Sequence, residues 1–194
     1  YFQKNELKLK RWQRLYRERM IREDLRDLKE VRDVRMLENL ALLLQEKAGG
    51  QLSYESLRDD LHCSFESVKV WIDLLEALFY CYRIRPYSKR IKRSIAKEPK
   101  IFLYDWTLAQ SKGAKIENLI AGHLLKACHA WTDCAFGEFE LFYVRDREKR
   151  EVDFFITRDR SPYALIETKS GDSNPSKSLL YYQGILIPKF TLQV

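Results

Sequence analysis

The chain has 194 residues, of which 45% are hydrophobic and 13% aromatic, and its formal net charge is +7. This composition is typical of a globular protein and excludes a disordered one, while no apolar run approaches the roughly 20 residues that cross a bilayer. The four cysteines have no CxxC spacing. We therefore expect reduced thiols, a cytoplasmic location and no contact with a membrane.

The first segment, residues 1–35, is predicted to be a charged helical lead-in. It carries twelve basic and seven acidic side chains, with apolar residues at loosely helical intervals. This pattern predicts one or two exposed helices with opposite charges along their surface. Residues 1–3 resemble the remnant of a cleavable tag, and we assign them no function.

The second segment, residues 36–106, shows three helical patterns and then two strands that flank a basic turn. The helices are expected over 36–47, 53–61 and 65–79, and the strands over 80–87 and 100–104. Three helices followed by a basic β-hairpin are the plan of a winged helix-turn-helix. In that plan the third helix enters a DNA groove and the wing contacts phosphates.

Basic residues of this segment are the candidates for binding nucleic acid. Residues 83–100 carry eight basic side chains against Glu98 alone, and such a local concentration suits phosphate binding. The candidates are Lys69, Lys89, Arg90, Lys92 and Arg93. The third helix also carries acidic side chains that DNA would repel, so a module that contacts only proteins is an equal alternative.

The third segment, residues 107–194, alternates helices and strands. The predicted order is a helix over 115–130, a strand over 138–145, a two-stranded hairpin over 150–169, a helical segment over 179–184 and a strand over 189–194. Helix, three strands, helix and strand is the order of the PD-(D/E)XK nuclease core. We therefore expect an α/β protein in which a winged helix precedes a restriction-endonuclease-like mixed sheet.

The hairpin of the third segment carries a set of charged residues suited to catalysis. Side chains alternate along a strand, so Glu167 and Lys169 should point the same way, where Asp153 of the neighbouring strand can meet them. Two carboxylates beside an ammonium suit a divalent metal that cleaves a phosphodiester. The alternative is a solvated strand face, which is the commoner origin of such a match taken alone.

Several runs, in chain order, resemble the C-terminal half of a large group of prokaryotic AAA+ ATPases, an uncharacterised domain that follows the ATPase module. These runs are Asp24–Leu28, Val70–Glu76, Ile84–Tyr87, Lys97–Trp106, Glu117–Ala121, Tyr143–Arg145, Glu151–Phe154 and Ile166–Lys169. The resemblance implies that the chain is a fragment whose ATPase module lies upstream. No GxxxxGK[ST] loop occurs in it, so we expect no ATP site.

The resemblance also implies an active site. Glu117, Asp153, Glu167 and Lys169 fall on the active-site positions of the nuclease-like fold. Asp153 and Glu167 would hold Mg²⁺ or Mn²⁺, and Glu117 and the carbonyl of Thr168 would complete the ligands. Lys169 would offset the charge of the transition state.

The sequence offers one further candidate binding residue and leaves two alternative functions. Gln183 is expected to contact phosphate or water. The first function is metal-dependent phosphodiester hydrolysis by the nuclease-like part of a AAA+ ATPase. The alternative is a non-catalytic DNA- or protein-binding module that regulates or assembles the missing ATPase, with homo-oligomerisation left open.

Overall fold

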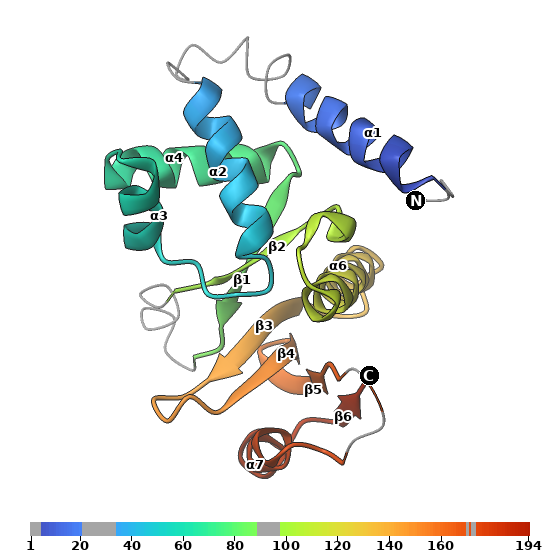
Figure 1. Ribbon diagram of the computed structural model, residues 1–194. Coiled ribbons are helices and arrows are strands. Elements are labelled where there is room, and N and C mark those ends of the chain that lie inside the picture. Colours follow the sequence, from blue (N-terminus) through green and yellow to red (C-terminus); the bar gives the residue numbers. More distant parts are fainter. Residues whose placement is uncertain (1–4, 21–33, 89–97, 170, 172–173) are drawn as a thin grey trace. The chain divides into compact units, whose positions relative to one another are not determined.

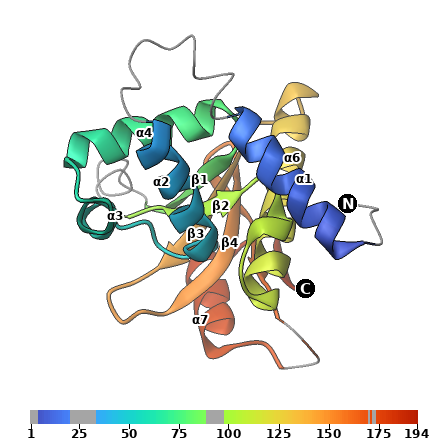
Figure 2. The ribbon, with the colours of Figure 1, turned by 45° about the horizontal axis from the view of Figure 1, so that its top comes forward.

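The computed structural model describes residues 5–20, 34–88, 98–169, 171 and 174–194 (Figure 1, and Figure 2 from a second direction). Its described part is a mixed α/β structure with six α-helices, the short 3-10 helix η2 (Trp106–Leu108) and one six-stranded mixed sheet. The expected α/β class is confirmed. None of the described helices is long and apolar enough to cross a membrane.

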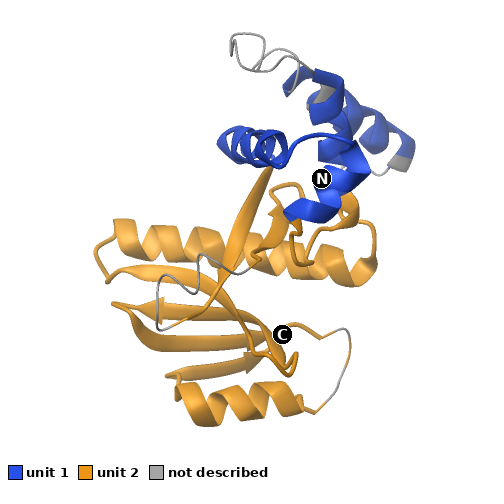
Figure 3. Cartoon of the chain, turned by 90° about the vertical axis from the view of Figure 1, so that its left-hand side faces the viewer, with its two compact units in different colours: residues 1–44, 54–80 blue, residues 45–53, 81–194 orange. Residues whose placement is uncertain are grey.

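Two compact units divide the chain, residues 1–44 with 54–80 and residues 45–53 with 81–194 (Figure 3). Strands β1 (Cys81–Pro86) and β2 (Lys100–Leu103) belong to the second unit. The division therefore differs from the expected boundary between residues 106 and 107. The physical reason is that β1 also pairs with β3 (Phe139–Arg145), so the predicted wing hairpin is continuous with the main sheet.

The first unit is helical. It contains α1 (Glu6–Arg19), α2 (Val34–Glu46), α3 (Tyr54–Leu61) and α4 (Phe65–Ala77). Three leucines of α2 that the sequence places on one face (Leu37, Leu40 and Leu44) are fully buried. The hydroxyl of Ser64 accepts a hydrogen bond from the backbone N–H of Ser67 at 3.0 Å and so begins α4. The helices expected over 36–79 are confirmed.

The second unit is a sheet with a helix on each face (Figure 3). The strand order is β2-β1-β3-β4-β5-β6, in which β4 is Glu151–Arg158, β5 is Ser161–Glu167 and β6 is Phe190–Gln193. Only the β1–β3 and β5–β6 pairs are parallel among the strands described. Helix α6 (Lys112–Asp133) covers one face and α7 (Lys177–Leu186) the other.

Each face of the sheet has its own apolar core. On the α6 face, Phe102, Phe154 and Ile166 of the sheet pack with Ala121 and Cys128 of the helix. On the α7 face, a second cluster forms from Val144, Val152, Phe155, Leu165, Leu179 and Tyr182. Burial on both sides explains the uninterrupted apolar segments Phe154–Ile156 of β4 and Tyr163–Ile166 of β5.

Strand β4 contains one extra residue where it runs beside β3. Phe142 pairs with Phe155 and Val144 with Val152, so one residue of β3, Tyr143, lies opposite two residues of β4. Val152 and Phe155 consequently pack on the α7 face although they are three positions apart. The bulge leaves Asp153 and Phe154 between them, and Phe154 packs on the α6 face.

Candidate functional site

A buried lysine, Lys100, stands at the centre of the acidic side chains on the α6 face. It is the first residue of β2 and only 4% exposed. Its Nζ atom lies 2.7 Å from Oε1 of Glu151 and 3.0 Å from Oε1 of Glu117. Oδ1 of Asp153 is 3.7 Å away. We call Lys100 with Glu117, Glu151 and Asp153 the Lys100 cluster.

The electrostatics of the Lys100 cluster keep the ammonium charged. Burial lowers the pKa of Lys100, but the carboxylates of Glu117, Glu151 and Asp153 raise it by more, so the net pKa lies above the ordinary value. Burial is also the largest influence on Glu117 and raises its pKa, which Lys100 opposes. The carboxylates thus need a cation, and Lys100 supplies one.

The second carboxylate oxygens of Asp153 and Glu151 also have partners. Oδ2 of Asp153 accepts hydrogen bonds from both the backbone N–H and the hydroxyl of Thr168, each at 2.8 Å. Oε2 of Glu151 accepts from Nη1 of Arg145 at 2.7 Å. The cluster therefore links β2, β3, β4, α6 and the end of β5.

Two residues place Glu117 beside Lys100. The amide of its neighbour Asn118 accepts a hydrogen bond from the backbone N–H of Leu103 at 2.8 Å, which fixes α6 against β2. Gly49 has a φ of +82°, and a Cβ there would lie 3.1 Å from Oε2 of Glu117. A glycine at this position permits both the left-handed backbone and the close approach of the carboxylate.

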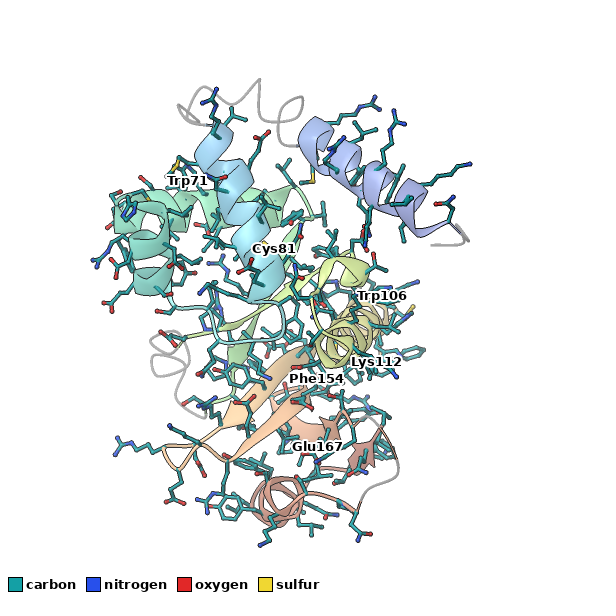
Figure 4. The ribbon with its side chains drawn as sticks, in the orientation of Figure 1. Trp71, Cys81, Trp106, Lys112, Phe154 and Glu167 are labelled. Carbon is teal, nitrogen blue, oxygen red and sulfur yellow. The ribbon has the colours of Figure 1, made fainter. Side chains whose placement is uncertain are left out.

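The structure brings together only some of the predicted site residues. Glu117 and Asp153 share Lys100, and Thr168 contacts Asp153 through its N–H and hydroxyl. Along β5, Ile166 packs on the α6 face and Leu165 on the α7 face, so alternation directs Glu167 to the α7 side. Figure 4 labels Phe154 and Glu167 on these neighbouring strands.

The environments of Glu167 and Lys169 differ strongly. Glu167 is 8% exposed, and its Oε2 atom has no hydrogen-bond partner among the described residues. Lys169 is exposed, and its backbone N–H donates to the carbonyl of Val194 at 2.8 Å. Neither side chain takes part in the Lys100 cluster.

The predicted nucleic-acid contacts are exposed where the structure describes them. Lys69 lies on the surface of α4 and Gln183 on the surface of α7. Lys89, Arg90, Lys92 and Arg93 lie outside the described residues.

Sequence reasoning gave no role to Lys100 or Glu151, although both stand in runs that carry the family resemblance. A signal for Lys100 was present, because it begins the buried run Lys100–Leu103 as its only polar member. A lysine at the start of an apolar strand indicates a buried partner of opposite charge. The partner itself is seventeen positions away, on a helix.

In the observed side-chain arrangement, the Lys100 cluster has no room for a divalent metal ion. The space between the carboxylates holds the ammonium of Lys100, which already pairs with two of them at 3.0 Å or less. In the part of the chain that the structure describes, no three Asp, Glu, His or Cys side chains are grouped so that they could hold a metal ion.

The fold and site define a mixed α/β protein with a lysine-centred carboxylate cluster. The chain belongs to the family described as "Domain of unknown function (DUF8612)", whose family model matches residues 2–133. The model of a second family, "Domain of unknown function (DUF4143)", matches residues 112–189. No curated protein and no solved structure matches the chain.

The two family matches overlap on helix α6. The overlap, residues 112–133, has the same bounds as that helix, which carries Glu117. Lys100 lies only in the first match, and Glu151 and Asp153 lie only in the second. The Lys100 cluster is therefore assembled from both matched regions.

Proposed function

We propose that this chain is a non-catalytic binding module that regulates or assembles a AAA+ ATPase. The observation that carries the proposal is the ammonium of Lys100, which lies among the carboxylates that would otherwise be free to hold a catalytic metal. The cluster acts as a structural ion-pair network that joins the strands to α6.

The chemistry of metal-dependent hydrolysis supports this assignment. Such a reaction needs carboxylate oxygens that are open to Mg²⁺ and a water molecule. Here Asp153 directs one oxygen toward Lys100 and the other toward Thr168. Lys100 has a raised pKa and so is held as an ammonium, which cannot accept a proton from an attacking water.

The ATPase context is supported by two observations. The sequence resembles the C-terminal half of AAA+ ATPases, and the second matched domain is commonly found alongside AAA ATPase domains. Within the proposal, α2 to α4 with the β1–β2 hairpin serve as a winged helix, and the rest of the sheet unit is nuclease-like. Nucleic acid or the ATPase itself is then the partner.

Metal-dependent hydrolysis is the second candidate, and Glu167 favours it. A buried carboxylate oxygen without a hydrogen-bond partner is costly unless something else satisfies it. A cation near the end of β5 would do so. This candidate requires Lys100 to leave the carboxylates and Glu167 to reach Asp153.

We expect no cleavage when the chain is incubated with linear, circular or single-stranded DNA and Mg²⁺ or Mn²⁺. A gel-shift measurement on the same samples reports binding. The control variants are Asp153→Ala in the cluster and Asp133→Ala at the exposed end of α6. Cleavage that disappears in Asp153→Ala and persists in Asp133→Ala would contradict the proposal and establish a nuclease.

A further inference from the structure

A cavity of about 690 Å³ lies in the second unit, where strands β1 and β3 separate. The two strands are paired only at Arg85 with Phe142 and at Pro86 with Tyr143. The cavity lies between the two strands, beside these pairs, and residues of β1, β3 and α6 contribute to its lining. The lining residues are Arg83, Arg85, Tyr87, Ser88, Leu125, Cys128, His129, Phe139–Phe142, Thr157 and Arg160.

The lining of this cavity is positively charged. It includes the guanidinium groups of Arg83, Arg85 and Arg160, against one carboxylate, that of Glu140. Neither Arg85 nor Arg160 forms an ion pair with any residue that the structure describes. Burial raises the pKa of the Cys128 thiol to about 11, so this thiol adds no negative charge at neutral pH.

A buried hydroxyl in the cavity wall independently indicates a missing ligand. Thr157 is 1% exposed, and its Oγ1 atom has no hydrogen-bond partner among the described residues. Its position is set by an irregularity in the β4–β5 pairing between Ile156 and Thr157. Buried hydroxyls are nearly always hydrogen-bonded, and an unsatisfied one commonly marks a ligand or water.

We propose that this cavity binds the phosphate group of a nucleotide. Arg83, Arg85 and Arg160 supply guanidinium donors, whose planar geometry matches phosphate oxygens, and Thr157 supplies a hydroxyl donor. Tyr87 and Phe142 pack edge to face in the same lining, with ring centroids 5.7 Å apart. They offer apolar surface to a base, and the volume is that of a small-molecule site.

This site is separate from the Lys100 cluster. The cavity lining contains none of the four residues of the cluster. The proposed phosphate donors are guanidinium groups and a hydroxyl, so binding should not require Mg²⁺. The inference is therefore independent of whether the cluster is catalytic.

Calorimetric titration in EDTA tests the inference with three probes: inorganic phosphate, AMP and a single-stranded oligonucleotide. We expect AMP to bind and Arg85→Gln to weaken its binding about tenfold, because a charge-assisted hydrogen bond is lost. Arg147→Gln removes the same charge from an exposed turn and should leave binding unchanged. An oligonucleotide that binds more tightly than AMP, again weakened by Arg85→Gln, would identify nucleic acid as the source of the phosphate.

Thr157→Val separates a ligand-binding role from a structural one. Valine has nearly the shape of threonine and removes the unsatisfied hydroxyl, so the Tm of this variant should be unchanged or higher. Its AMP affinity should nevertheless fall about tenfold, through loss of a hydrogen bond from the hydroxyl to the charged phosphate. The inference fails if no probe binds at millimolar concentration, or if Arg85→Gln and Thr157→Val both bind AMP as the unaltered protein does.

Discussion

Replacing Lys100 with methionine should lower the free energy of unfolding by about 3–5 kcal/mol, the usual loss when one partner of a buried ion pair is removed. Methionine keeps most of the length and apolar stem of lysine. The loss therefore reports the missing ammonium, which leaves Glu117, Glu151 and Asp153 together without their shared cation. Urea denaturation at pH 7 measures it.

The pH dependence of this loss has a defined sign. The pKa of Lys100 is raised in the folded state, so its contribution is fully present below the unfolded pKa of about 10.4. Burial already raises the pKa of Glu117, and Lys100→Met removes the cation that opposes this rise, so this carboxyl is more readily protonated in the variant. The destabilisation should therefore shrink as the pH falls from 7 toward 5.

A matched control is Lys126→Met, because Lys126 is exposed on α6 in the same unit. Its effect on the free energy of unfolding should stay within about 0.5 kcal/mol. A Lys100→Met variant as stable as this control would contradict a structural role for the Lys100 cluster.

Replacing Phe154 with alanine should cost about 3–5 kcal/mol, the range for a large buried aromatic side chain. Phe154 is fully buried on the α6 face, with its ring centroid 5.8 Å from that of Phe102. It follows Asp153 in the bulge of β4, so its packing also fixes the direction of that carboxylate. The midpoint of urea denaturation is the measurement.

Phe136→Ala is the control for Phe154, since Phe136 belongs to the same unit and is 60% exposed. It should change stability by about 0.5 kcal/mol or less. Equal midpoints for the two variants would show that the α6-face core does not hold β4 in place.

Periodicity predicted most of the secondary structure correctly. The leucine stripe of α2 and the apolar stripe of α6 have the 3.6-residue repeat of a helix covering a core. The β4–β5 hairpin follows from two apolar runs around Arg158 and Pro162. The pairing of β1 with β3 was not predictable in this way, because it joins strands more than fifty residues apart through only two residue pairs.

The candidate site was predictable only in part. Glu117 and Asp153 were identified, and they do share a partner. The sheet face that Asp153 occupies depends on the extra residue in β4, because a shift of one residue moves a side chain to the opposite face. The sequence prediction assumed strict alternation along both strands of the hairpin and did not include the bulge in β4. It therefore placed Glu167 beside Asp153. Lys100 was missed because its acidic partners come from two segments, α6 and β4, that are distant from it in the sequence.

Binding of Mn²⁺, followed by electron paramagnetic resonance, tests most directly whether Lys100 occupies the place of a metal. We predict no Mn²⁺ binding at micromolar concentration by the unaltered chain. We also predict that Lys100→Met gains binding, which Asp153→Ala added to that variant removes. Micromolar Mn²⁺ binding by the unaltered chain that is lost in Asp153→Ala would contradict the account and favour a metal-dependent nuclease.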